Sequence, residues 1–338
     1  MNSPNPEPNN RSLTIRSESL YSGEFTATED ANFHSGKHFS GTRLKALLVP
    51  VLYKLIQRAP IPVAALPMRS LLFLLRLFYA WPNNSFRQAC EYICKVAANR
   101  GYQHNPKQVY RQLIKNANGV LNNYFQLYRD GVDTILDRIE ISVQDAARMN
   151  RLAHEHGGVL IAVPHNFASL FSAVKMCREF PLVIVSRNPS TIERTKIAVD
   201  VYERMAVSIL MVRGGNPFEL SRTLFSILKS GKAVAATVDS MDHSDGAAKA
   251  TIFGQHIGFP TWAAKIAAKK RIPVVPSYFR SNGKQVTAIY GEELISDSTE
   301  EIVQHYVSFF EKCILEDPAS WAYLGDKRWR RVLQKASK

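Results

Sequence analysis

The chain has 338 residues, of which 46% are hydrophobic and 21% are charged, and its formal net charge is +14. The length suits one large domain with appendages or two smaller domains, and the composition excludes a mainly disordered chain. The positive excess favours an anionic partner, such as nucleic acid, an anionic membrane or an acidic protein, without choosing among them.

The first part of the chain divides into a polar tail and an apolar segment. Residues 1–41 are rich in Asn, Ser, Pro, Thr, Glu and Gly and lack apolar periodicity, which predicts a disordered tail. Residues 42–82 are very apolar, but Lys, Arg and Pro interrupt them, and no uncharged run approaches the ~18–20 residues of a spanning helix. Apolar faces with basic flanks are typical of helices that lie in a membrane interface, although packing on the globular domain is the alternative. We therefore predict that residues 42–82 form a membrane-associated helical segment.

Residues 83–155 are predicted to be a helical lead-in to a single α/β domain that spans residues 83–338. Three helix starts are visible: a capping box that begins at Ser85, the pair Asn105 and Pro106, and a cap at Ser142. Apolar side chains recur at helical spacing after the second start, which supports a helix there.

Short apolar runs alternate with helical segments from residue 157 onward. The runs lie at 159–163, 182–185, 209–212, 233–238 and 274–278, with a candidate edge strand at 286–290. Helices are expected after Asn216, over about 262–270 and over about 299–315. Continuous apolar strands with helices between them predict an α/β fold whose mostly parallel sheet is flanked by helices.

Polar side chains stand just after four of these strands. His165 follows the first strand, Arg187 the second, Arg213 the third and Asp239 the fourth. Ligands of open parallel sheets bind beyond the carboxyl ends of the strands, so these four residues are expected to border an active site. A histidine in this place suits a general base, although a hydrogen-bonded structural histidine is the alternative.

The order and spacing of several sequence blocks resemble the late acyltransferases of lipid A biosynthesis. The blocks are VLIAVPHNF, SRNPS, YER at residues 202–204, LKSGKAVAATVD, IFGQHIGFPTWAAKIAAKKRIPVVP and PASWAYLGDKRWRR. These lauroyl and myristoyl transferases belong to the lysophospholipid acyltransferase superfamily, and the resemblance covers about residues 85–331. It implies a membrane-associated acyltransferase that moves an acyl group from a carrier-protein thioester to a lipid or small-molecule hydroxyl or amine, with His165 as the general base.

The chain departs from the family pattern of a histidine, four residues and then an acid. Four residues after His165 comes Ser169, and Leu170 stands where the acid belongs; Asp326 also replaces a histidine of the closing block. Asp239 is the leading candidate to orient the His165 ring, because a carboxylate from another segment can serve. Ser169 is the second candidate, through a weaker neutral hydrogen bond. A third possibility is an amine acceptor, which depends less on a strong base.

Substrate-binding roles are expected near the same strand ends. Backbone N–H groups of Asn166 and Phe167 suit an oxyanion if a helix begins there. Arginine side chains suit phosphate of the donor's pantetheine arm or of a lipid head group, although plain surface charge is the alternative. The candidate substrate-binding residues are Asn166, Arg187, Asn188, Arg204 and Arg213.

The donor implied by the resemblance, an acyl carrier protein, is strongly acidic, and two basic clusters suit its docking. The clusters are Lys265, Lys269, Lys270 and Arg271, and Lys327, Arg328, Arg330 and Arg331. An ordinary solvated face is the alternative for both, and the second cluster equally suits lipid phosphates. No Gly-rich phosphate loop and no metal-ligand spacing is visible, so no cofactor and no metal are expected.

The leading interpretation is a peripheral acyltransferase at the cytoplasmic face of the bacterial inner membrane, with a carrier protein or other acyl thioester as donor and a lipid as acceptor. One alternative is an aminoacyl or unusual-acyl transferase of the same superfamily. The other is a non-catalytic relative that binds lipid or carrier protein, which the missing acid favours. A nucleic-acid partner is not expected, because it accounts for the charge but not for residues 42–82 or the strand-end pattern.

Overall fold

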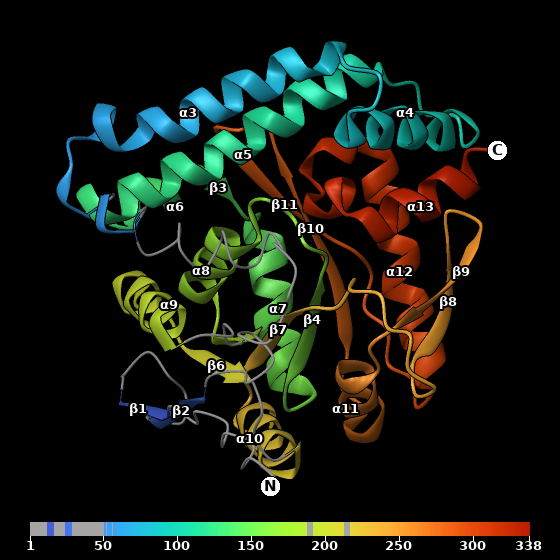
Figure 1. Ribbon diagram of the computed structural model, residues 1–338. Coiled ribbons are helices and arrows are strands. Elements are labelled where there is room, and N and C mark those ends of the chain that lie inside the picture. The colour runs from blue at the N-terminus through green and yellow to red at the C-terminus, as the bar shows by residue number, and fades with distance from the viewer. Residues whose placement is uncertain are drawn as a thin grey trace, which may run out of the picture.

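The structure is a computed structural model that describes residues 12–16, 24–28, 51, 53–55, 57–187, 192–212 and 217–338 (Figure 1). Within the stretch predicted to be a disordered tail, two short strands, β1 (Ser12–Arg16) and β2 (Glu24–Thr28), pair antiparallel. The other residues of that tail lie outside the described residues, as do residues 42–50, 52 and 56 of the predicted membrane segment.

A seven-stranded sheet forms the centre of the molecule, in the order β3-β11-β10-β4-β7-β5-β6. Its strands are β3 (Ile139–Glu140), β4 (Val159–Val163), β5 (Leu182–Arg187), β6 (Ile209–Val212), β7 (Ala233–Thr237), β10 (Val274–Ser281) and β11 (Val286–Tyr290). Neighbours are parallel throughout, except for the antiparallel pair β10 and β11. The predicted α/β class with a mostly parallel sheet is therefore confirmed.

Both faces of the sheet are covered, which explains why its central strands read as continuous apolar runs. All five residues of β4 are buried, and its alternate side chains enter two separate core clusters. Leu160 and Ala162 belong to one cluster, whereas Val159, Ile161 and Val163 belong to the other. Successive strand side chains point to opposite faces, so the two clusters are the two sides of the sheet.

Different sets of helices supply the two clusters (Figure 1). One side is packed by α7 (Val143–Glu155), α8 (Ser169–Glu179) and α9 (Ile192–Met205). The other is packed by α4 (Ser85–Ala98), α10 (Pro217–Lys229), α11 (Trp262–Lys270), α12 (Thr299–Glu316) and α13 (Lys327–Ala336). The long helix α5 (Pro106–Arg129) contributes to both clusters.

Helix starts agree with the sequence at two of three places. Asn105 and Ser142 cap α5 and α7 through their side chains, as predicted. The cap of α4 is Asn84, whose Oδ1 accepts from the backbone N–H of Phe86 at 2.9 Å. The predicted capping box at Ser85 is therefore wrong, because Asn84 is the residue outside the helix whose side chain reaches back to it.

The hairpin of β8 (Ala248–Ile252) and β9 (Gln255–Phe259) was not predicted from the sequence. Its two turn residues, Phe253 and Gly254, both have positive φ, of 54° and 73°. Such two-residue turns normally carry Asn, Asp or Gly at their first position, so a phenylalanine there gives no turn signal.

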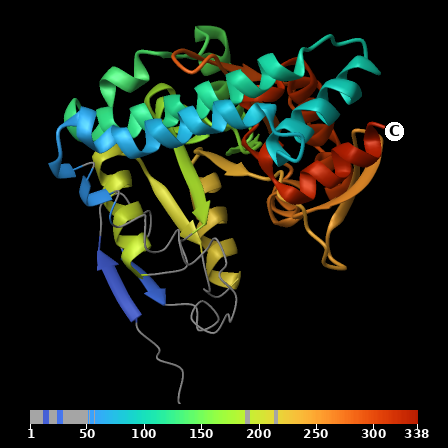
Figure 2. The same ribbon diagram turned by 45° about the horizontal axis from the view of Figure 1, so that its top comes forward.

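Helix α3 (Ile61–Leu77) lies antiparallel to α5 on the outside of the domain. Figure 2, in which the top of the molecule is turned forward, shows α3 running across the outer surface of the domain. Ala64, Ala65 and Leu72 are buried. Its other faces and the turn that follows expose large apolar side chains, namely Val63, Leu66, Leu71, Phe73, Leu74, Leu77, Phe78 and Trp81.

A span of 19 residues, Pro62–Ala80, is long and apolar enough to cross a membrane by length and composition alone, and 17% of its most apolar window is buried in the domain. No segment of spanning length was predicted from the sequence. The difference arises because Arg69 and Arg76 lie within the helix without ending it.

Gly119 allows α5 to lie against the turn between β10 and β11. A Cβ atom at this position would lie 2.6 Å from the carbonyl oxygen of Gly283. We expect Gly119→Ala to lower the free energy of unfolding, because strain towards the upper end of ~1–3 kcal/mol exceeds the ~1 kcal/mol that alanine gains in a helix. Urea denaturation measures this. Gly246→Ala is the control, since no atom lies within 4 Å of its added Cβ; an equal change in both variants would contradict the packing argument.

Candidate active site

His165 and Asp239 come together at the carboxyl edge of the sheet. His165 lies two residues beyond β4 and Asp239 two residues beyond β7, and these adjacent parallel strands pair Val163 with Thr237. Equal offsets from a paired register bring the two side chains side by side. The ring Nδ1 of His165 is hydrogen-bonded to Oδ1 of Asp239, and the His165 backbone N–H donates to Oδ2 at 3.0 Å.

The carboxylate of Asp239 is enclosed by hydrogen-bond donors. The residue is only 3% exposed, so its oxygens depend on protein partners rather than on water. The indole Nε1–H of Trp321 donates to Oδ2 at 3.0 Å, in addition to the two bonds from His165. With Nδ1–H directed at the carboxylate, the neutral ring carries its free lone pair on Nε2, which is the arrangement of a general base.

Trp321 belongs to the closing block of the sequence, and its role was not apparent from the sequence. It is fully buried and packs edge-on to Trp329 of α13, with ring centroids 5.0 Å apart. Asp326, which replaces a histidine of the family pattern, caps α13 by accepting from the backbone N–H groups of Arg328 and Trp329. The aspartate therefore stabilises the start of α13, the helix whose Trp329 packs on Trp321.

Tyr323, which was not among the predicted site residues, covers one face of the histidine ring. Its ring stacks on that of His165 with centroids 4.2 Å apart and an interplanar angle of 21°. Its hydroxyl lies 3.2 Å from His165 Nε2 and 3.2 Å from the hydroxyl of Ser240. An acceptor that gives its proton to Nε2 has to take the place of the Tyr323 hydroxyl.

Ser169 supports the loop around His165 and does not hold the ring. Its Oγ accepts from the backbone N–H of Asn166 at 2.9 Å and donates to the carbonyl of Pro164 at 3.2 Å. The predicted hydrogen bond from Ser169 to the ring is therefore absent from the described contacts of these two residues.

Asn166 is bonded to protein groups through both its side chain and its backbone N–H. It is 6% exposed, and its side chain donates to the carbonyl of Ser320 at 3.1 Å and accepts from the backbone N–H of Phe279 at 3.4 Å. The N–H of Phe167 also donates to Ser320, at 3.1 Å. The two backbone donors predicted to form an oxyanion site thus already have protein acceptors.

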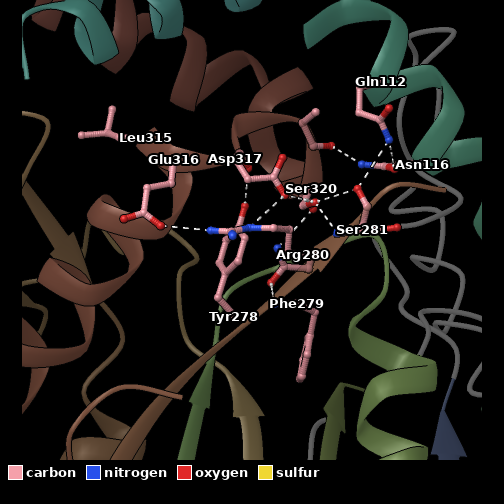
Figure 3. A network of polar contacts seen from close by, with 12 residues as sticks. Gln112, Asn116, Tyr278, Phe279, Arg280, Ser281, Leu315, Glu316, Asp317 and Ser320 are labelled. Atoms are coloured by element: carbon pink, nitrogen blue, oxygen red, sulfur yellow. Dashed lines mark hydrogen bonds and ion pairs between the residues drawn. The ribbon is translucent and has the colours of Figure 1, made fainter. Parts of the chain in front are cut away.

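A polar network holds Ser320 (Figure 3). Because the carbonyl of Ser320 accepts from Asn166 and Phe167, the network also supports the loop that follows His165. The hydroxyl of Ser320 donates to Asp317 at 2.6 Å and accepts from the N–H of Ser281 at 2.8 Å. Asn116 of α5 donates to the carbonyl of the preceding residue, Ala319, at 2.9 Å. Burial raises the pKa of Asp317, and the hydrogen bond from Ser320 acts in the opposite direction. The network therefore ties the closing block to α5, β10 and the end of α12.

A cavity of about 340 Å³ opens beside the His165 ring. Its described lining is mostly apolar and consists of Val163, His165, Ser169, Leu170, Ala173, Ile184, Val185, Ser186, Tyr202, Ala235, Ala236 and Thr237. Leu170, in the place of the family's acid, gives the cavity apolar surface instead of a carboxylate. The hydroxyls of Ser186 and Tyr202 are 2.8 Å apart and form a polar patch in the wall, and burial raises the pKa of Tyr202.

The other predicted binding residues are not brought to this cavity by the described structure. Arg204 forms an ion pair with Asp200 at 3.0 Å and lies 4.6 Å from the ring centroid of Tyr128, and it is absent from the described lining. The side chain of Arg187, and the whole of Asn188 and Arg213, lie outside the described residues. Among those residues, no group of three or more His, Cys, Asp or Glu side chains is placed to hold a metal ion.

The fold and this site define an α/β protein that pairs an imidazole with a buried carboxylate beside an apolar cavity, a combination suited to group transfer onto a nucleophile. A model of the bacterial lipid A biosynthesis acyltransferase family matches residues 100–331. The match spans more than half of the chain, so the protein belongs to that family, as its sequence blocks predicted. Membership implies an acyltransferase with an acyl donor and a lipid acceptor, in a family that is membrane-associated in bacteria. A comparison with curated proteins found no match.

Proposed function

We propose that the protein is a membrane-associated acyltransferase in which His165, oriented by Asp239, takes the proton from a lipid hydroxyl or amine. The observation that carries this proposal is the hydrogen bond from His165 Nδ1 to the buried carboxylate of Asp239. It selects the tautomer whose Nε2 accepts a proton, and the carboxylate stabilises the imidazolium that results.

The reaction needs no further reagent. The acceptor oxygen or nitrogen attacks the thioester carbonyl carbon while its proton passes to His165 Nε2. The carbon–sulfur bond then breaks, and the imidazolium returns the proton to the departing thiolate, which leaves a new ester or amide and a free carrier thiol. Tyr323 leaves Nε2 when the acceptor arrives, because both bind the same lone pair.

The acyl group is proposed to occupy the cavity beside His165. Its size and mostly apolar lining, with a few polar groups, are typical of small-molecule sites. The hydrogen-bonded hydroxyls of Ser186 and Tyr202 favour a second candidate function, the transfer of an acyl group that itself carries a polar or amino substituent. A plain alkyl chain leaves those hydroxyls paired with each other, whereas a polar substituent gains a hydrogen bond from them.

The test is single-turnover transfer to lipid A in vesicles from carrier-protein thioesters of three kinds: plain fatty acyl, hydroxyacyl and aminoacyl. Transfer of the fatty acyl group supports the leading function, and transfer only of the substituted groups supports the second. Binding of carrier protein or lipid without transfer of any of them would instead identify a non-catalytic relative.

Membrane association is proposed to be peripheral and to occur through α3. The cytoplasmic face of the inner membrane is the proposed location, because a carrier-protein donor is present on that side. The helix is apolar on nearly all sides, although only one side packs on α5. A helix of this kind outside a protein core belongs in a membrane environment. Because α3 lies lengthwise against the domain, we expect its outer apolar side chains to enter one leaflet.

Removing apolar surface from α3 is expected to weaken membrane binding. Phe73 and Leu77 are each 58% exposed, and each contributes about 1.5–3 kcal/mol when fully buried in an apolar phase. We expect Phe73→Ser with Leu77→Ser to weaken flotation with anionic vesicles by at least ~100-fold in affinity. Val143→Ser with Ile295→Ser is the matched control, since these side chains are exposed elsewhere. Flotation of both double variants like the parent would rule out α3 as the membrane contact.

Carrier-protein docking is proposed at the basic cluster on α13, because Trp329 of that helix packs on Trp321, which contacts Asp239. The other basic cluster lies on and just after α11, which leads into the amino end of β10 and so stands at the opposite edge of the sheet from His165. The distance between that edge and the catalytic ring makes the α11 cluster the weaker candidate.

We therefore expect Arg328→Glu with Arg330→Glu to slow association with carrier protein and to reduce its salt dependence, because charge steers the encounter. Stopped-flow measurement at several salt concentrations tests this. Lys269→Glu with Lys270→Glu makes the same change in net charge at the far edge and should have the smaller effect. A larger effect at Lys269 and Lys270 would move the dock to α11.

A further inference from the structure

A second cavity, of about 510 Å³, lies at the end of α3 and is separate from the one beside His165. Its described lining consists of Arg76, Leu77, Tyr79, Lys107, Gln108, Tyr110, Arg111, Gln112 and Lys115. Four of these residues are cationic, and none is acidic. Among the described residues, no carboxylate lies within ion-pair distance of the four. The cavity therefore concentrates positive charge that no carboxylate of the described residues neutralises.

The cations are arranged by helix periodicity. Lys107, Arg111 and Lys115 are spaced four residues apart on α5, so they form one stripe along that helix. All three are exposed, and Arg76 reaches the same cavity from the last turn of α3. The stripe begins in the first turn of α5, where the helix dipole adds to the positive potential.

The wall of this cavity is fixed by contacts of its own. The Tyr110 hydroxyl donates to the carbonyl of Leu75 and accepts from Asn84, which ties α3 to α5. Tyr79 packs edge-on to Tyr110, with centroids 5.1 Å apart, and the guanidinium of Arg87 lies 5.2 Å from the centroid of Tyr79. These contacts hold the wall in place before any ligand arrives, which lowers the entropy lost on binding.

We infer that this cavity binds the phosphate of a membrane lipid head group. Cationic side chains grouped without a carboxylate match a phosphate, and a terminal phosphate, with its second charge, matches them better than a phosphodiester does. The adjoining exposed side chains, Leu77, Phe78 and Trp81, are apolar. They place the cavity where head groups lie once α3 enters the leaflet, with the cations at the level of the phosphates.

A membrane lipid fits this setting better than an acidic carrier protein does. A docked protein would have to cover the apolar rows of α3 as well as the cations, whereas a bilayer takes up both at once. The inference rests on the proposed membrane association through α3. It adds a defined phosphate site to the general attraction between a basic protein and an anionic membrane.

The experiment uses the full chain with three kinds of vesicle: phosphatidylcholine alone, and phosphatidylcholine doped with either phosphatidic acid or phosphatidylglycerol. We expect the parent to bind best to vesicles with phosphatidic acid. Lys107→Gln with Lys115→Gln should weaken that binding about 30-fold, since each basic side chain near an anionic surface contributes roughly a factor of five. Binding to phosphatidylcholine alone should not change. The matched control is Lys196→Gln with Lys249→Gln, two exposed lysines away from the cavity.

Equal losses in the cavity variant and the control would overturn the inference, because general charge would then account for binding. Loss of carrier-protein association with unchanged vesicle binding would assign the cations to the donor instead. Calorimetry with glycerol phosphate in solution completes the test. If the parent binds this soluble compound as tightly as it binds the vesicles, and the cavity variant loses that binding, the ligand is a soluble phosphate and not a membrane lipid. If Phe73→Ser with Leu77→Ser abolishes flotation while the cavity variant matches the control, membrane association stands and only the phosphate site fails.

Discussion

His165→Ala is expected to lower the single-turnover rate of acyl transfer by ~10²–10⁴-fold, the usual contribution of a positioned acid–base group. The loss arises because no other described side chain that lines the cavity is a histidine or a carboxylate that could take the proton. The variant should fold, since the ring is partly exposed and its main contacts are to Asp239 and Tyr323. Circular dichroism and a thermal melt check this before the rate is interpreted.

His256→Ala is the matched control for this experiment. His256 lies on β9, is exposed, and is hydrogen-bonded to Thr251. It should transfer acyl groups at the parent rate. If His165→Ala also transfers at that rate while folded, the ring is structural, and the proposed mechanism loses its base.

Asp239→Asn is expected to have an effect nearly as large, for a reason that lies in the geometry of the carboxylate. Oδ2 accepts two N–H bonds, from the backbone of His165 and from the indole of Trp321. In the asparagine variant, the side-chain oxygen must take the place of Oδ2, because only an oxygen can accept these two bonds. The NH₂ group then takes the place of Oδ1 and faces His165 Nδ1. The ring then has to accept at Nδ1 and carry its proton on Nε2, which removes the base. The same exchange in a serine-protease triad lowers kcat by about 10⁴-fold.

Leu170→Glu provides the second half of this test. Leu170 lines the cavity beside His165 and stands where the family carries its acid. A glutamate there should restore part of the activity of Asp239→Asn, and it should give no gain in the parent, whose ring already has a partner. Single-turnover rates of the four chains form a double-mutant cycle. Full activity of Asp239→Asn would show that the Asp239 contact does not orient the base.

The expected effects of Asp239→Asn and Leu170→Glu concern the acid that the family carries at the position of Leu170. In the family pattern the acid follows the histidine by about one helical turn, so one segment carries both groups. Here the carboxylate comes from a neighbouring strand, and a tryptophan of the closing block holds it. Leu170 instead lines the cavity, which links the absence of the local acid to the shape of the proposed acyl site.

Much of the fold follows from local pattern. The apolar runs of β4 and β6 coincide with the observed strands, because short continuous apolar runs suit strands that are covered on both faces. The predicted strand at 286–290 is β11, but it is not at the edge of the sheet, because β3 pairs with its outer side. The caps at Asn105 and Ser142 are equally local, since a cap depends on residues within one turn. The sequence alone also placed His165 and Asp239 at strand ends and identified the family.

Tertiary structure decided what lies beside what. Chain order suggests that β4 neighbours β5, but β7 lies between them, and only this strand order brings Asp239 to His165. Trp321 reaches Asp239 from 82 residues away, and Tyr323 reaches the His165 ring from 158 residues away, so no local period reveals them. The cationic cavity likewise needs α3 to fold back along α5. Local patterns report which face of an element is apolar, whereas a site depends on the packing of elements that the chain keeps far apart.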